Sequence, residues 1–538
     1  MHRVARLAIP TIAILVFGLI GSSAASPNAG LNKQDAAKKI LSSGASKNMT
    51  GPARAFVEAT ARGDHRLSVD TNVITQKGNR VNSSKPVGGG SLPNVRVNNP
   101  AADRAGVGQT TQSETAIAVS GSNVAVGYND SAGGLVFYVA GDDLTGYSYS
   151  TDGGQTFTDG GALPNLGGNV NVGDPWLTSD SAGNMYFSTL TIDGPTGLLL
   201  VGVSKSTDGG KTWTGAATIP LAPNIAFAFA DKEAITAGPG NGNLYVAWDD
   251  FNFDIVGNFS LGMPVAHSID GGQTWTTSYA TNFTFGPNTG CSFQQEIGAQ
   301  PFVLGGAVFV AAEQFKVDNP TCDPNGGTFS LNEVVFVSRD SGATWKAGAT
   351  IPITPSTQIG AFVLAPSQIM RNIEFPTLAV FKGNLFMAWN DGGDGSGHSH
   401  IRLAQLDNSG NLVGSTSFVT SGTNDEAQPS LTGDSSLHLT YYQISTDANG
   451  NGQLDVFISN SSNGNSWKTQ RVTSQSFPGV YTVPQFDPLI AFAYMGDYIA
   501  SVTDGQHVYM AWGDNRDIVT DFLWPNGRHD PDVFFARQ

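Results

Sequence analysis

The sequence predicts an all-β protein built from repeated four-stranded units, and three observations support this fold class. Only 13% of the 538 residues are charged, whereas Gly occurs 66 times and Pro 27 times, which favours short strands and turns over long helices. One turn sequence recurs along the chain, and so does one kind of apolar strand. A hydrophobic content of 40% excludes a disordered chain.

The recurring turn has the pattern Ser-x-Asp-x-Gly-x-Thr followed by Trp or Phe. Its acidic residues are Asp152, Asp208, Asp270 and Asp340, and a degraded copy covers residues 463–467. A short carboxylate accepts hydrogen bonds from the N–H groups of its own turn, and Gly permits a positive φ. We therefore expect these aspartates to close turns and not to perform chemistry.

Each repeat contains an inner strand, a strongly apolar second strand, a third strand that enters the turn, and an outer strand. The second strands are predicted at Asn123–Asp130, Asn184–Thr191, Asn243–Asp250, Ala307–Gln314, Asn384–Asp391, Leu437–Gln443 and His507–Asp514. Their spacing gives seven units of about 61 residues, a length that suits four strands with generous loops. A count of six units is the alternative.

The turn pattern resembles the Asp box, or BNR repeat, of the sialidase-like superfamily. This resemblance implies a single β-propeller over residues 91–538, with the boxes on one face and ligand sites on the opposite face. The last unit ends at Asp532–Gln538 with a third strand. Because an open apolar edge invites aggregation, we expect Asn94–Asn98 to pair with that strand and close the ring.

The beginning of the chain resembles a secretory signal. Residues 1–26 combine a basic start, an apolar run and small residues before an expected cleavage near Ala25. We therefore expect a secreted protein, extracellular or periplasmic, with a membrane anchor as the alternative. Residues 27–90 are interpreted as a leader or linker outside the propeller, with helical stretches at Leu31–Ser42 and Ala53–Arg62.

An exported location predicts one further feature of the fold. Cys291 and Cys322 are expected to form a disulfide, with two free thiols as the alternative.

A loop near the C-terminus spaces oxygen ligands as a Ca²⁺ site does, although Ile458 stands where the last acid is expected. The predicted ligands are Asp447, Asn449, Asn451, Gln453 and Asp455. This loop resembles the calcium-binding hairpins of integrin-type propellers, and an ordinary Asn/Gly turn is the alternative.

Acidic and polar residues gather where the inner strands begin. They are Glu114, Asp174, Asp231, Lys232, Glu233, Gln300, Glu374, Glu426, Asp497 and Tyr498. Carboxyl groups crowded around a concave centre acquire different pKa values, which supplies the acid and the base of glycoside hydrolysis. The catalytic candidates are Asp174, Asp231, Glu233, Glu374 and Asp497, with Tyr498 assisting. The alternative is that these residues fix the strand starts and hold water.

Sialidases clamp the sugar carboxylate with three arginines, the first in an Arg-Ile-Pro motif that this sequence lacks. Arg371, Arg516 and Arg528 are the substrate-binding candidates that remain. The sequence therefore predicts either a glycoside hydrolase acting on an extracellular glycan or glycoprotein, or a non-catalytic propeller that binds carbohydrate or protein. The net charge of −16 argues against nucleic acid as a partner, and a monomer is expected.

Overall fold

The computed structural model describes most of the chain from Lys33 to the C-terminus. The described ranges are 33–43, 51–63, 92–103, 111–131, 143–286, 288–323, 327–357, 361–365, 368–447, 449–479, 495–520 and 525–538. The predicted signal, residues 1–26, lies outside them. Within these ranges, none of the helices combines the length and the apolar character that crossing a membrane requires.

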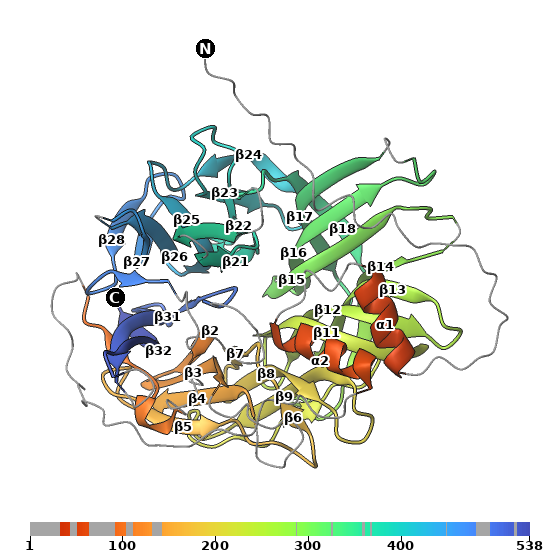
Figure 1. The fold of residues 1–538 in the computed structure, drawn as a ribbon, viewed down its shortest axis with the longest axis horizontal. Helices are drawn as coiled ribbons and strands as arrows, with labels where there is room; N and C mark the ends of the chain where they lie inside the picture. Colours follow the sequence, from red (N-terminus) through yellow and green to blue (C-terminus); the bar gives the residue numbers. More distant parts are fainter. Residues whose placement is uncertain are drawn as a thin grey trace.

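The β-sheets stand side by side around a common centre (Figure 1). Four sheets contain four strands, in the orders β2 (Gln112–Ser120), β3 (Asn123–Asp130), β4 (Thr145–Ser150), β5 (Thr158–Ala162); β15 (Phe293–Leu304), β16 (Ala307–Asp318), β17 (Thr328–Ser338), β18 (Lys346–Pro352); β21 (Thr377–Phe381), β22 (Asn384–Asp391), β23 (His400–Leu406), β24 (Leu412–Phe418); and β1 (Val95–Arg96), β32 (Arg528–Arg537), β31 (Val508–Val519), β30 (Ala500–Thr503). The first strands β2, β15 and β21 lie nearest the centre (Figure 1).

The other sheets follow the same plan with additions. One has the order β25 (Asp425–Gly433), β26 (Leu437–Thr446), β27 (Gly452–Ser461), β28 (Lys468–Arg471), with β29 (Phe477–Pro478) on β27. A nine-stranded sheet contains β6 (Val170–Asn171), β7 (Trp176–Ser179), β8 (Met185–Ile192), β9 (Leu199–Ser206), β10 (Ala217–Thr218), β11 (Ile225–Ala237), β12 (Leu244–Asp254), β13 (Phe259–Ser268) and β14 (Thr276–Thr284). Its two halves meet at one parallel pair, Phe229 with Leu199. A hairpin of β19 (Ala361–Ala365) and β20 (Gln368–Arg371) forms a separate two-stranded sheet.

The second strands agree closely with the sequence prediction. Each predicted segment overlaps one of the strands β3, β8, β12, β16, β22, β26 and β31. The predicted pairing of the first and last strands is also present, because Val95 lies opposite Phe535 and Arg96 opposite Phe534. The hydrogen bond from Val97 N–H to the carbonyl of Val533 continues this pairing beyond β1.

The Asp-box turns are closed by their own aspartates, as the sequence predicts. Oδ1 of Asp270 accepts hydrogen bonds from the N–H groups of Gln273 and Thr274, and Oδ2 accepts from the Thr274 hydroxyl. The degraded box keeps the same turn, with Asn463 Oδ1 in place of the carboxylate. These contacts close the turns and leave the box carboxylates engaged within them.

The boxes also fix the packing of neighbouring sheets. Gly154 has a φ of 83°, and a Cβ atom there would lie 2.2 Å from the ring of Phe535 in the last strand. The box aromatic Phe157 packs against the same ring with centroids 5.0 Å apart. Only glycine allows this close approach, so the first box is held against the last sheet.

The strand register places the box and the inner-strand acid at opposite ends of the first sheet. In the first sheet the box residue Ser150 pairs with Val124 at the start of β3, whereas Gln112, beside Glu114, pairs with Asp130 at its end. The predicted separation of the two sets onto opposite faces therefore follows from the pairing.

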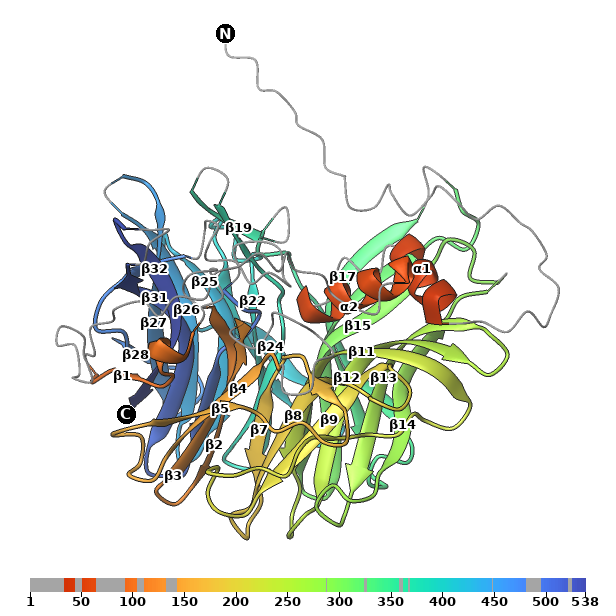
Figure 2. The same ribbon diagram turned by 60° about the horizontal axis from the view of Figure 1, so that its bottom comes forward.

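Two helices precede the sheets and correct the prediction for residues 27–90. Helices α1 (Lys33–Ser43) and α2 (Gly51–Arg62) form near the expected positions, but they pack against the sheets instead of lying outside the fold (Figure 2). Ala36, Ala37 and Ile40 are fully buried in one core cluster with Phe253 and Phe259. Their spacing gives α1 an apolar face, and burial of that face explains the docking.

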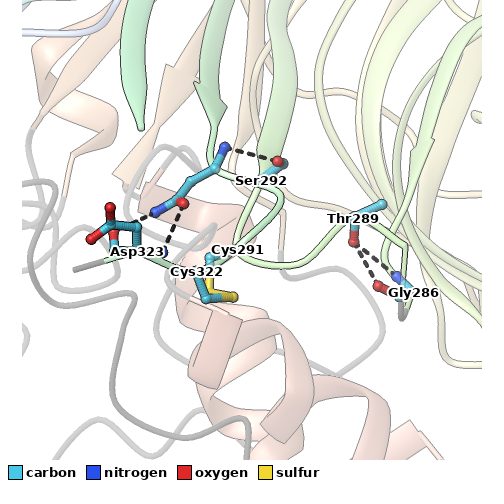
Figure 3. Close-up of a disulfide and its surroundings, with 7 residues drawn as sticks. Gly286, Thr289, Cys291, Ser292, Cys322 and Asp323 are labelled. Carbon is cyan, nitrogen blue, oxygen red and sulfur yellow. Dashed lines mark hydrogen bonds between the residues drawn. A yellow bond between two sulfur atoms is a disulfide. The ribbon is translucent and has the colours of Figure 1, made fainter. Parts of the chain in front are cut away.

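Cys291 and Cys322 form the predicted disulfide at the entry to β15 (Figure 3). The two half-cystines are separated by 31 residues in the sequence. The backbone N–H groups of both cysteines donate to the carbonyl of Asn319. The disulfide therefore fastens the loop after β16 to the segment that leads into β15.

Candidate active site

A recurring backbone feature lies within the inner strands or just before them. Residues with positive φ occur there in the left-handed region: Glu114, Asp174, Lys232, Gly298, Gln428 and Gly496. At Glu114, Lys232, Gly298 and Gln428 the register with the second strand also shifts. A left-handed non-glycine residue costs roughly 1 kcal/mol or more, so the surrounding structure must impose this conformation.

A buried ion-pair network lies among these strand starts. Lys232 Nζ is 2.7 Å from Oδ2 of Asp497, and Arg371 Nε donates to Oδ1 of Asp497 at 2.7 Å. Arg371 also contacts Oδ2 through Nη2. The side chains of Lys232 and Asp497 are almost fully buried, whereas 27% of the Arg371 side chain is exposed. Two cations from distant segments therefore neutralise one carboxylate.

Several predicted acids gather around this network. Asp174, Asp231 and Glu233 are all buried. Burial, followed by repulsion from Glu114 and Asp231, raises the pKa of Asp174 well above its usual range. Burial is also the largest cause that raises the pKa of Glu233. Among the described residues, no hydrogen-bond donor of another residue reaches either carboxyl oxygen of Asp174 or Glu233.

Glu374 has a more polar environment. Its Oε1 accepts hydrogen bonds from Ser356 N–H at 2.8 Å and from Asn372 Nδ2 at 2.9 Å. Burial nevertheless raises the pKa of Glu374 to about 7, because these bonds offset only part of the desolvation. Burial and the neighbouring Glu374 charge raise the pKa of Glu313. Burial therefore favours the protonated form of both Glu374 and Glu313.

Some of the central acids also connect neighbouring sheets. Asp249 Oδ1 accepts the N–H of Gly298 at 3.3 Å, and Glu313 Oε2 accepts the N–H of Glu374 at 3.1 Å. Glu114 Oε1 accepts the N–H of Asp497 at 3.0 Å. In each case the acceptor belongs to one sheet and the donor to the inner-strand start of another. These acids have a structural role whether or not they perform chemistry.

The sequence prediction missed Asp249, Glu313 and Glu333. Asp249 ends the apolar run of β12, and Glu313 follows Val308–Ala312 within β16. Glu333 lies opposite Glu313 on β17, and both carboxyl groups are fully buried. An acid inside an otherwise apolar strand is the sequence signal that would have found them, because such burial requires a partner or a proton.

Other predicted residues have different partners. The Tyr498 hydroxyl donates to the Pro175 carbonyl at 3.0 Å, and its ring packs on Trp176 with centroids 5.3 Å apart. Glu426 Oε2 lies 2.5 Å from Nδ1 of His400. Tyr498 thus bridges two sheets. Glu426 instead pairs with His400.

Arg516 and Arg528 form ion pairs within the last sheet, unlike Arg371. Arg516 contacts Asp514, and Arg528 Nη1 lies 3.1 Å from Asp530 Oδ1. At most 4% of either arginine side chain is exposed. This correction to the predicted substrate-binding set has a simple cause, because each arginine is buried and pairs with an aspartate two residues away in the sequence.

The predicted calcium loop divides its ligands between two environments. Oδ1 of Asp447 accepts hydrogen bonds from the N–H groups of Asn449 and Asn451. Asp455 instead lies within β27, where it contacts Arg471 at 2.6 Å and accepts from the Thr473 hydroxyl. Gln453 is also in β27. Calcium binding at this loop stays a prediction.

Comparisons with known proteins give structural likenesses at low similarity. No family model matches the chain. No curated protein matches it. The α-L-arabinanase of Penicillium chrysogenum, solved with arabinobiose, is 13% identical with a TM-score of 0.37, covering 68% of this chain and 92% of that one. The Hadza microbial sialidase Hz136 is 16% identical with a TM-score of 0.39, covering 69% and 68%. A protein of unknown function from Dyadobacter fermentans is 12% identical with a TM-score of 0.40, covering 84% and 99%. Similarity at this level assigns no activity to this chain.

Proposed function

We propose that this protein is a secreted glycoside hydrolase that cleaves extracellular glycans at the axial carboxyl cluster of a seven-bladed propeller. Seven blades follow from the seven second strands, with the nine-stranded sheet counted as two blades that touch at Phe229 and Leu199. The pairing of β1 with β32 supports closure of the ring.

One observation carries the proposal: a short segment holds two carboxyl groups in different charge environments. Arg371 contacts Asp497, whose other cation is Lys232, whereas Asn372 donates to Glu374. Glu374 has a pKa of about 7, raised by burial, while two cations neutralise Asp497. Glycoside hydrolysis requires one carboxyl group that gives a proton and one that stays anionic.

The roles follow from these environments. Glu374 is proposed as the general acid that protonates the leaving oxygen, because its pKa suits proton transfer near neutral pH. Asp497 is proposed as the second carboxyl group, the one that stays anionic during hydrolysis. The exposed part of Arg371 is proposed to bind the substrate, since its guanidinium reaches both solvent and the buried carboxylate.

A panel of fluorogenic aryl glycosides that includes sialosides and arabinofuranosides tests the proposal. We expect hydrolysis of at least one member, with a rate that falls above pH 7 as Glu374 loses its proton. Glu374→Gln should lower kcat by about 10² to 10⁴-fold. Asp340→Asn, in an exposed box turn, is the matched control and should keep the activity. Unchanged activity in Glu374→Gln would remove this residue as the acid.

A second candidate is a non-catalytic propeller that binds glycans through the same face. The deep burial of Asp174, Asp231 and Glu233 favours it, because acids that are at most 2% exposed reach a substrate with difficulty. No hydrolysis of any glycoside, together with binding on a glycan array that Arg371→Met abolishes, would support this second function over the first.

A further inference from the structure

Three aspartates meet where the first described strand joins the last one. Asp103 follows a short 3₁₀ helix, η3 (Pro100–Ala102), while Asp530 and Asp532 belong to β32. One carboxylate oxygen from each residue lies within 4.8 Å of those from the other two. Asp530 and Asp532 are fully buried, and Asp103 is partly exposed.

Asp532 supplies a second and independent observation. Its Oδ1 accepts a hydrogen bond from Asn98 Nδ2 at 2.8 Å, but no donor among the described residues bonds to Oδ2. Arg96 Nη1 lies 3.7 Å from that oxygen and makes its short contact, 2.6 Å, with Asp517. A fully buried carboxylate oxygen without a hydrogen-bond donor is costly. A bound cation would give Oδ2 of Asp532 the close partner that the hydrogen bonds do not provide.

The junction is rich in charged groups. Among the residues that the structure describes, carboxylates and guanidinium groups meet there: Asp103, Asp517, Asp530, Asp532, Arg96 and Arg528. Oxygen donors alone match a hard divalent cation, and Ca²⁺ tolerates irregular carboxylate geometry better than Mg²⁺ does.

We propose that Asp103, Asp530 and Asp532 bind Ca²⁺ and thereby fasten the segment after β1 to the last strand. Asn98 already joins these elements, because it donates to Asp532 and accepts the N–H of Val533. The cation would add a link from Asp103, which stands beyond the end of the β1 pairing. The site is separate from the loop at Asp447 and from the axial carboxyl cluster.

Calcium titration of the full-length protein after chelator treatment and buffer exchange tests the proposal. We expect binding by isothermal titration calorimetry and a rise in Tm with millimolar Ca²⁺, because a ligand that binds only the folded state stabilises it. Asp532→Asn should abolish the rise. In chelator, this variant should be at least as stable as the wild type, since it removes a buried charge.

Two other variants separate this site from its alternatives. Asp103→Asn changes a partly exposed ligand and should weaken Ca²⁺ binding at least about tenfold without preventing folding. Asp447→Asn changes the predicted loop site and should leave the titration at the junction unchanged. The proposal is wrong if the wild type shows no Ca²⁺ binding, if both Asp103→Asn and Asp532→Asn keep the wild-type affinity, or if Asp447→Asn alone removes the response.

Discussion

The box turns and the centre of the molecule both contain carboxyl groups, but the turns are exposed and the centre is buried. Asp270 lies in an exposed turn, where the hydroxyl and then the N–H of Thr274 lower its pKa to about 2. Glu374 lies at a buried strand start, where desolvation raises its pKa to about 7. The turn stabilises the carboxylate form of Asp270, whereas burial stabilises the protonated form of Glu374.

The difference shows that position in the repeat determines what a carboxyl group does. At the box end of each sheet, turn N–H groups satisfy the charge without help from another strand. At the axial end, several acids share a few donors and two cations, Lys232 and Arg371. The first arrangement is local and repeated, whereas the second requires that distant strands meet.

Removal of the central cation should give the largest effect on stability. Lys232→Met leaves Asp497 with Arg371 alone and leaves the neighbouring acids without their buried cation. We expect a loss of about 3 to 5 kcal/mol in the free energy of unfolding, because one partner of a buried ion pair is removed. Urea denaturation measures this loss.

Lys205→Met is the matched control, because Lys205 lies over the Tyr186 ring near a box turn and contacts none of the axial acids. Its loss should stay below about 1 kcal/mol. Equal effects of the two substitutions would show that Lys232 is not the electrostatic centre of the cluster.

The pH dependence of stability should show the next largest effect. The folded-state pKa of Glu374, about 7, exceeds its ordinary value of 4.5, so its contribution is fully present below pH 4.5 and is lost as the pH rises through 7. Burial also raises the pKa of Asp174 and Glu233. The free energy of unfolding should therefore fall between pH 5 and pH 8, by up to about 1.4 kcal/mol per pH unit for each linked proton.

Urea midpoints across this pH range check the sign. Glu374→Gln should reduce the slope, since glutamine cannot titrate. Asp340→Asn should leave the slope unchanged between pH 5 and pH 8, because hydrogen bonds from Thr344 keep the pKa of Asp340 at about 2. A stability that rises toward pH 8 would contradict the buried, protonated state of the axial acids.

The sequence predicted the repeated parts of the molecule well, because each repeat supplied the same evidence again. The boxes, the second strands and the acids at the inner-strand starts all follow from the repeat. Asp249 and Glu313 were missed because they lie in apolar strands, which were interpreted as core. Burial of Arg516 and Arg528 depends on which face of a strand meets a neighbouring sheet. The repeat pattern does not indicate that face.

The leader helices were misjudged for the same physical reason. The apolar face of α1 is visible in the sequence, but its partner is a sheet more than 200 residues away, at Phe253 and Phe259. Helical periodicity predicts that such a face will be buried and says nothing about where. The sequence therefore did not predict contacts between nonrepeated segments that are far apart in the chain.

The smallest expected effect belongs to a single box. Asp270→Asn keeps an oxygen that can accept the N–H groups of Gln273 and Thr274, as Asn463 does in the degraded box, and loses the charge. The pKa of Asp270, about 2, lies below its ordinary value of 3.8, so its contribution is present above pH 3.8 and is lost as the pH falls through 2. The variant should lower Tm by about 1 to 2 °C at pH 7 and leave it unchanged near pH 2. Thermal melts at both pH values measure this change. If Asp270→Asn lost as much stability as Lys232→Met, the boxes and the axial cluster would not be the separate systems that their environments indicate.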